Sequence, residues 1–214
     1  MIKTRKKGYL IVISGPSGAG KGTICSSLLK RNEKLIESVS MTTRPKREYE
    51  IEGTDYFFTT KEDFERKISD DYFLEFATVH NNEYYGTPRK DVEDKLKAGY
   101  NVILEIDIQG AIKIKEKIED ALYIFILPPS MKELKNRLVK RGTESEEKIL
   151  ARFKTAYQEI NEINKYNYVV VNDILEDAVA KVEAILVAET CRVDRIEELD
   201  VGNMEEVIHE DLIK

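Results

Sequence analysis

The sequence predicts an α/β fold in which a parallel sheet of five strands carries helices on both faces. Four short runs rich in β-branched residues, 8–14, 101–108, 122–127 and 166–171, are typical of strands buried on both faces. Amphipathic stretches separate the runs, and such alternation favours parallel pairing. With 214 residues the chain can form one substantial core.

Six stretches between or beside these runs show the spacing of amphipathic helices. Ser130 with Glu133, and Thr143 with Glu146, have the spacing of a capping box, in which each side chain bonds a backbone N–H at the helix start. In chain order the expected helices cover residues 23–31, 61–68, 91–97, 130–140, 143–161 and 173–189.

The region from residue 38 to residue 88 breaks this alternation. It is rich in Thr, Tyr, Arg and Glu, and its strand-like pieces at 55–58, 73–78 and 83–86 are short. One helical stretch interrupts them. We therefore predict a small mixed α/β insertion on the parallel core.

Net charge restricts the classes of partner. The chain carries −6, and the segment from Asp194 onward, with eight acidic and two basic residues, accounts for all of it. The neutral body argues against a nucleic-acid binder, and no apolar run approaches the roughly 18–20 residues of a membrane span. We expect a cytoplasmic protein without nucleic-acid or membrane partners. The acidic segment, 194–214, is expected to be a mobile amphipathic helix or a disordered tail.

The stretch GPSGAGKGT at residues 15–23 lies between the first strand and the first helix. It fits a phosphate-binding loop, in which backbone N–H groups surround phosphate oxygens and Lys21 reaches the β- and γ-phosphates. The following helix presents its N-terminal dipole to the anion. A glycine-rich turn with an incidental lysine is disfavoured because strand, glycines, lysine and helix are all in register. The expected ATP contacts are Gly15, Pro16, Ser17, Gly18, Ala19, Gly20, Lys21, Gly22 and Thr23.

Gly22 departs from this motif, which has Ser or Thr directly after the lysine. That hydroxyl normally contacts Mg²⁺. Either Thr23 turns inward to replace it, or the nucleotide phosphates and water hold the ion, because Mg²⁺ often keeps several waters. Mg²⁺ is thus expected as cofactor, with Thr23 as a candidate ligand.

A second anion site is suggested by the stretch SVSMTTRPKR at residues 38–47. Its Arg44 and Arg47 are suited to bidentate phosphate contacts. Each polar residue here would singly be an ordinary loop residue. Beside a phosphate loop, they favour a second anionic ligand.

At this point the chain closely resembles guanylate kinase, which transfers a phosphate from ATP to GMP. The resemblance runs from about residue 8 to residue 190. It implies ATP, GMP and also dGMP as substrates, Mg²⁺ as cofactor, and a monomer or small homo-oligomer. The matching pieces are GPSGAGKGT, SVSMTTRPKR, GTDYF, FLEFA, YYGT, LEIDIQG, PPS, RLVKRGTE and VND.

The resemblance also implies roles by position. Arg44, Arg47, Tyr56 and Tyr85 would hold the GMP phosphate, and Ser40, Glu75, Thr87 and Asp107 would recognise guanine. A carboxylate such as Glu75 can accept both the N1–H and the N2 amino group of guanine, whereas adenine would leave it unpaired. Such a site can reject the wrong base by roughly 10⁴-fold. Asp107 and Glu105 could equally position Mg²⁺ through water.

An arginine-rich stretch at residues 137–144 completes the pattern. Arg137 and Arg141 share one helix face, which could be a solvated basic face, but the resemblance implies a lid. Arg137, Arg141 and Arg152 would reach the transferred phosphoryl group, and Asn172 would contact adenine. No general base is needed, because the attacking GMP phosphate oxygen is largely ionised at neutral pH. The implied catalytic residues are Lys21, Arg44, Arg137, Arg141 and Arg152.

These inferences divide the chain into segments and leave alternatives. A kinase acting on AMP or UMP and a non-catalytic guanylate-kinase-like module that binds proteins are the rivals, although such a module can lose the loop lysine that is present here. A P-loop NTPase would leave the second anion site unexplained. The expected segments are a core with the phosphate loop (1–39), a GMP-binding insertion (40–88), core (89–129), a lid (130–160), core (161–193) and an acidic tail (194–214).

Overall fold

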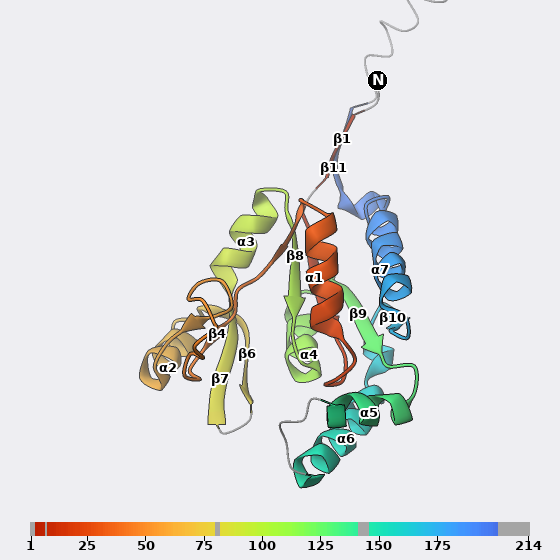
Figure 1. Cartoon of the computed structure of the whole chain (residues 1–214). Coiled ribbons are helices and arrows are strands. Elements are labelled where there is room, and N and C mark those ends of the chain that lie inside the picture. The colour runs from red at the N-terminus through yellow and green to blue at the C-terminus, as the bar shows by residue number, and fades with distance from the viewer. Residues whose placement is uncertain (1–2, 7, 80–81, 141–145, 201–214) are drawn as a thin grey trace, which may run out of the picture.

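A parallel five-stranded sheet forms the centre of the protein in the computed structural model, which describes residues 3–6, 8–79, 82–140 and 146–200 (Figure 1). The strand order is β10-β9-β2-β8-β3, and every adjacent pair is parallel. The predicted sheet is confirmed, and its fifth strand is β3. The bounds are β2 (Leu10–Ser14), β3 (Leu35–Glu37), β8 (Asn101–Glu105), β9 (Leu122–Leu127) and β10 (Tyr168–Val171).

Helices cover both faces of this sheet, because successive side chains of each strand point to opposite sides. Ile11 and Ile13 pack with helices α1 (Lys21–Arg31) and α7 (Leu175–Glu189). Leu10 and Val12 pack on the other face with α3 (Arg89–Lys97) and α4 (Ile108–Lys117). Of these four helices, α4 was not predicted, since its first residue falls within the run read as a strand up to residue 108.

The predicted mixed insertion is a separate four-stranded sheet with the order β5-β4-β7-β6. Helix α2 (Lys61–Ser69) closes it through Phe64, which stacks on Phe73 with ring centroids 4.3 Å apart. Strand β6 packs against α4 of the main body, and this contact fixes the insertion beside the carboxyl end of β8. The strands are β4 (Met41–Thr42), β5 (Phe57–Phe58), β6 (Phe73–Val79) and β7 (Glu83–Pro88).

Two further helices, α5 (Met131–Lys140) and α6 (Glu146–Ile160), pack on each other through Leu134, Leu138 and Ala156. The Ser130 hydroxyl accepts a bond from the Glu133 backbone N–H at 3.1 Å, as expected for a cap. The second expected cap, Thr143, lies outside the described residues. Figure 1 shows these helices on one side of the phosphate loop and the insertion on the other.

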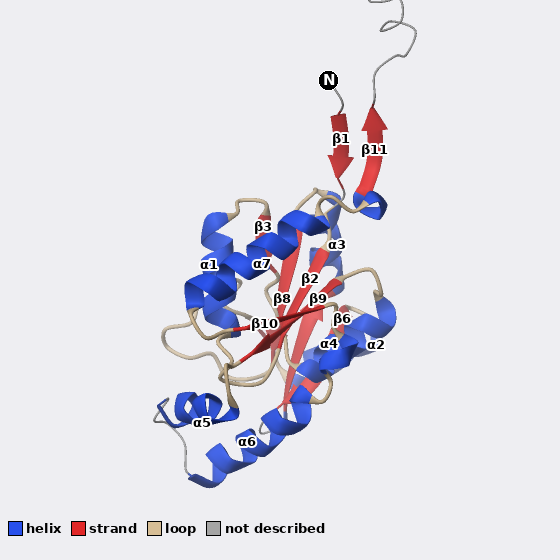
Figure 2. Ribbon diagram, turned by 90° about the vertical axis from the view of Figure 1, so that its right-hand side faces the viewer, coloured by secondary structure: helices blue, strands red, loops and turns tan. Residues whose placement is uncertain are grey.

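A two-stranded antiparallel ribbon of β1 (Lys3–Lys6) and β11 (Ile196–Asp200) projects from the main body (Figure 2). Neither alternative predicted for the acidic segment, a mobile helix or disorder, holds for residues 196–200. The register pairs Lys3 with Asp200 and Arg5 with Glu198. Within the described residues, no helix is long and apolar enough to cross a membrane.

Candidate active site

The phosphate loop leaves the sheet at the carboxyl end of β2, where its glycines adopt conformations that side chains disfavour. Gly15 has a φ of 144°, and a Cβ there would lie 2.2 Å from the Ile126 carbonyl oxygen. Gly20 is the left-handed N-cap of α1, with a Cβ position 2.3 Å from Nδ2 of Asn172. The path of the loop therefore requires glycine at both positions.

The Lys21 side chain folds back over this loop. Its ammonium group donates to the carbonyl oxygens of Gly15 at 2.7 Å and Pro16 at 3.4 Å. Burial lowers the pKa of Lys21, while nearby carboxylates, first Glu105 and then Glu159, act in the opposite direction. The loop thus holds a cation within reach of any phosphate that it binds.

Beside Gly22, where the motif usually has a hydroxyl, lies the carboxylate of Glu105. A Cβ on Gly22 would be 3.2 Å from Glu105 Oε2. Thr23, the next residue, is exposed in the first turn of α1. The Glu105 carboxylate therefore lies against Gly22, the position at which the usual motif has Ser or Thr.

The loop is braced from two other elements. Asn172, at the end of β10, is buried and donates from Nδ2 to the Ala19 carbonyl oxygen at 2.8 Å. Arg137 of α5 donates from Nη2 to the Asn172 carbonyl oxygen at 3.1 Å and from Nε to Glu133. Sequence reasoning missed the bond from Asn172 to the loop, because a contact between residues this far apart leaves no local pattern.

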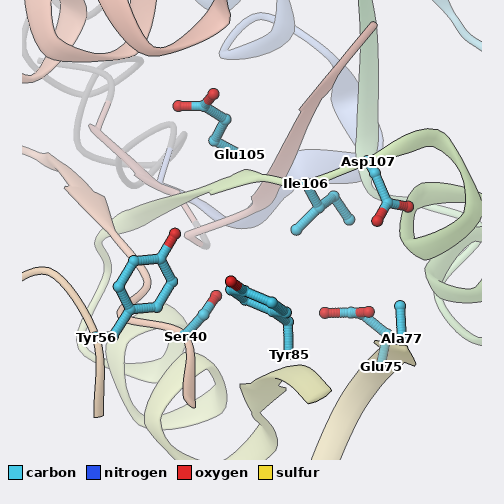
Figure 3. Close-up of a pocket in the computed structure, with 8 residues that line it drawn as sticks. All are labelled: Ser40, Tyr56, Glu75, Ala77, Tyr85, Glu105, Ile106 and Asp107. Carbon is cyan, nitrogen blue, oxygen red and sulfur yellow. The ribbon is translucent and has the colours of Figure 1, made fainter. Parts of the chain in front are cut away.

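A pocket of about 200 Å³ opens between the insertion and the carboxyl end of β8. Figure 3 shows the carboxylates of Glu75 and Asp107 at one end, and Tyr56 and Glu105 at the other, with Tyr85 between them. Five of the eight residues predicted to bind GMP line it. The full lining is Ser40, Tyr56, Glu75, Ala77, Tyr85, Glu105, Ile106 and Asp107.

The remaining three predicted GMP residues are not part of this lining. Arg44 is adjacent, since its Nε donates to the Tyr85 hydroxyl at 3.2 Å. Thr87 is fully buried behind Glu75, to which its hydroxyl donates at 2.9 Å. The Arg47 side chain is exposed and donates to the Tyr49 hydroxyl at 2.9 Å.

Glu75 is a buried carboxyl group with few compensating charges. Burial raises its pKa to about 7, and the negative charge of Asp107 adds to this effect, whereas the bond from Thr87 opposes it. Asp107 itself caps α4 by accepting the Gly110 N–H at 2.8 Å. A Cβ on Gly110 would stand 3.0 Å from Glu75 Oε2. The pocket therefore holds two acidic side chains in fixed orientations.

Arg44 is held by a carboxylate that the sequence did not single out. Glu50 is buried and accepts from Arg44 Nη2 at 2.7 Å and Nη1 at 3.0 Å. Hydrogen bonds from Arg44 hold the pKa of Glu50 down at about 2. The Arg44 guanidinium also lies over the Tyr56 ring, 5.4 Å from its centroid.

The lid arginines are only partly within the described structure. Arg152 is half-buried on α6, and Arg137 is held against Asn172 as described above. Arg141 lies outside the described residues. The convergence of all three arginines on one phosphoryl group therefore stays a prediction.

Comparisons with known proteins agree with this geometry. The family model described as guanylate kinase matches residues 7–189. The chain is 58% identical over 211 residues to a guanylate kinase of Clostridium perfringens, covering 99% of this chain and 97% of that protein. It is 55% identical over 204 residues to one from Caldanaerobacter subterraneus, covering 95% and 98%.

A solved structure gives the same result at lower identity. The crystal structure of guanylate kinase from Anaplasma phagocytophilum superposes with a TM-score of 0.74 at 36% identity, covering 97% of each chain. The family match spans the phosphate loop, the insertion and helices α5 and α6. The chain therefore belongs to the guanylate kinase family of ATP:GMP phosphotransferases.

Proposed function

We propose that the phosphate loop binds ATP, that the pocket binds GMP, and that the γ-phosphoryl group passes directly between them. The observation that carries this arrangement is the position of Glu105, which lines the pocket and also lies against Gly22 of the loop. One side chain therefore borders both sites. In this proposal residues 40–88 bind GMP, residues 130–160 act as the lid, and residues 1–39, 89–129 and 161–193 form the core.

Guanine would occupy the end of the pocket formed by Glu75 and Asp107. An ionised Glu75 accepts both the N1–H and the N2 amino group of guanine, and Thr87 holds that carboxylate at 2.9 Å. Adenine offers an acceptor at N1 and would leave the buried carboxylate unpaired, which is costly. Ser40 is the further polar group of the lining that we assign to the base.

The GMP phosphate would lie at the opposite end, near Tyr56 and Tyr85 and facing the phosphate loop. Arg44 reaches this end through its bond to the Tyr85 hydroxyl. Arg47, whose side chain is 58% exposed, can move toward a bound phosphate. This orientation points a phosphate oxygen of GMP at the γ-phosphate of ATP.

The chemistry requires positioning and charge neutralisation and no general base, because the attacking phosphate oxygen is already largely ionised. Lys21 would neutralise charge on the β- and γ-phosphates, and Arg137, Arg141 and Arg152 would approach the transferred group from the lid side. An arginine supplied in this way can be worth roughly 10³–10⁵ in rate. Asn172 braces the loop through Ala19, and its contact with adenine stays a prediction.

Mg²⁺ fits the oxygen donors at this place. When bound, Mg²⁺ would supply positive charge that stabilises the phosphates during transfer. Within the described residues, no group of three or more His, Cys, Asp or Glu side chains is arranged to hold a metal. One or two carboxylates acting with phosphates and water suit Mg²⁺. We propose that the Glu105 carboxylate, which lies against Gly22, is the protein ligand of Mg²⁺, with the Thr23 hydroxyl as the alternative.

A substrate panel with two variants tests the proposal. The wild-type enzyme should phosphorylate GMP and dGMP, since no assigned contact involves the 2′-hydroxyl, and should leave AMP, UMP and CMP nearly untouched. Glu75→Ala should raise KM for GMP by orders of magnitude and leave KM for ATP near its wild-type value. Lys21→Ala should reduce kcat by orders of magnitude with folding intact. Equal damage to GMP and ATP in Glu75→Ala would refute the base assignment.

A further inference from the structure

The Glu50 carboxylate is a built-in partner of Arg44. Its side chain is 5% exposed, and its two oxygens bond Arg44 Nη1 and Nη2 at 3.0 and 2.7 Å. The same carboxylate accepts the Arg47 backbone N–H at 2.8 Å. One buried anion therefore holds the Arg44 side chain and the Arg47 backbone of the second anion site.

Counting donors shows what Arg44 can still offer. A guanidinium has five N–H groups. Glu50 takes two of them, the Pro45 carbonyl oxygen takes one at 2.8 Å, and the Tyr85 hydroxyl takes one at 3.2 Å. No described residue accepts the fifth, which is on Nη2. Without a ligand, Arg44 therefore has a single N–H left for a phosphate, and the bidentate contact expected from the sequence stays a prediction.

The same hydrogen bonds orient the Tyr85 hydroxyl group. Its hydroxyl oxygen accepts the Arg44 Nε–H, so its own hydrogen is available for another acceptor. Tyr56 packs edge-on against Tyr85 with ring centroids 5.8 Å apart, and the Arg44 guanidinium lies over the Tyr56 ring. The two phenols and the remaining N–H of Arg44 are thus held as one unit beside the pocket.

We infer that Glu50 is a positioning residue for the phosphate of GMP, an inference that rests on the proposed role of Arg44. Glu50 holds the long Arg44 side chain in its binding conformation before GMP arrives, so the nucleotide does not have to order it. Since Glu50 also neutralises Arg44, the net positive charge that meets the phosphate comes from Arg47 and the lid.

A competing interpretation predicts the opposite sign. If Glu50 merely occupies Arg44 as a substitute anion, GMP must displace it, and removing its charge would strengthen GMP binding. If Glu50 positions Arg44, removing its charge weakens GMP binding. In Glu50→Gln the amide oxygen can still accept one N–H, but the amide NH₂ group faces the other Arg44 donor.

The experiment compares Kd values for GMP, guanosine and ATP in Glu50→Gln, Glu50→Asp and Arg44→Ala. Glu48→Gln is the matched control, because Glu48 lies two residues before Glu50 and its side chain is exposed, so the variant removes the same charge without touching a buried bond. Glu50→Gln should weaken GMP binding by about 10- to 100-fold, the loss expected for a charge-assisted hydrogen bond. Guanosine and ATP should bind as to the wild type, and Glu48→Gln should change none of the three.

Glu50→Asp keeps the charge, but its side chain is one methylene shorter and draws the carboxylate away from the two Nη atoms, so it should weaken GMP binding alone by about tenfold. If Glu50→Gln does not fold, Glu50→Asp still distinguishes a positioning role of Glu50 from competition with GMP. Unchanged or tighter GMP binding in both Glu50 variants, or equal losses for guanosine and GMP, would overturn the inference. If Arg44→Ala bound GMP normally, the failure would instead lie with the proposed phosphate site.

Discussion

Replacing Glu75 by Gln should stabilise the free enzyme at alkaline pH. The pKa of Glu75 is about 7 in the folded protein, against 4.5 for an unperturbed glutamate. Because the folded state holds the proton of Glu75 more tightly than the unfolded state, this proton contributes to stability. That contribution is fully present below pH 4.5 and is lost as the pH rises through 7. At 1.36 kcal/mol for each pKa unit, the ionised side chain costs about 3 kcal/mol above pH 7.

Urea unfolding at several pH values measures this cost. Between pH 6 and pH 8.5 the wild-type free energy of unfolding should fall by about 1.4 kcal/mol relative to Glu75→Gln, which cannot titrate. Other titrating groups are common to both proteins and cancel in the difference. A difference that stays constant over this range would refute the reasoning, because it would mean that Glu75 is already ionised at pH 6.

The same titration should appear in GMP binding. Guanine donates to the ionised carboxylate, so the nucleotide must displace a proton below pH 7. Wild-type affinity should fall by about tenfold between pH 8 and pH 6, with a further loss from the GMP phosphate, whose own pKa is about 6. Guanosine lacks that phosphate and should show the Glu75 contribution alone.

Two further substitutions test the surroundings of the site, and a third tests a buried ion pair away from it. Gly110→Ala should raise KM for GMP several-fold and leave KM for ATP unchanged, because its Cβ would lie 3.0 Å from Glu75 Oε2, even though alanine favours the helix by about 1 kcal/mol. Asn172→Ala removes the bond to Ala19 and should impair ATP binding by about tenfold, with the GMP Kd unchanged. Arg195→Ala removes both bonds that the buried Glu189 carboxylate accepts from Arg195 and leaves it only Arg192 at 3.4 Å and the Tyr168 hydroxyl. The free energy of unfolding should therefore drop by up to about 3 kcal/mol in urea titrations, while both KM values stay constant.

The sequence predicted those parts of the fold whose signals are local. The strands β2, β9 and β10 and the helices α1, α2 and α5 follow from apolar runs and caps. Strand β3 has three residues and could be recognised only from its pairing with β8. Helix α4 follows β8 after a two-residue connection and contains Gly110, which weakens its helical pattern, although Asp107 is a good N-cap.

The site was predictable to the extent that its motifs are contiguous. Phosphate-loop residues and the pocket carboxylates could be named because they lie in motifs that resemble those of guanylate kinase and their chemistry suits the implied ligands. Glu50 could not, because it lies among several acidic residues in a turn-rich stretch, and only burial distinguishes it from exposed Glu48. The brace from Asn172 to Ala19 joins segments more than 150 residues apart in the chain, so the folded sheet alone creates it.

Two buried glutamates show how environment gives one residue type opposite tasks. Glu50 has its partner permanently in place, and bonds from Arg44 lower its pKa to about 2, so it stays charged and holds the arginine still. Glu75 has no cation bonded to it among the described residues, and burial raises its pKa to about 7. Its charge is stabilised only when a ligand supplies two adjacent donors, which guanine does and adenine does not. The penalty that Glu75 imposes on the empty protein is therefore the physical source of selectivity for guanine, and filling its surroundings with a permanent cation would stabilise the fold while weakening that selectivity.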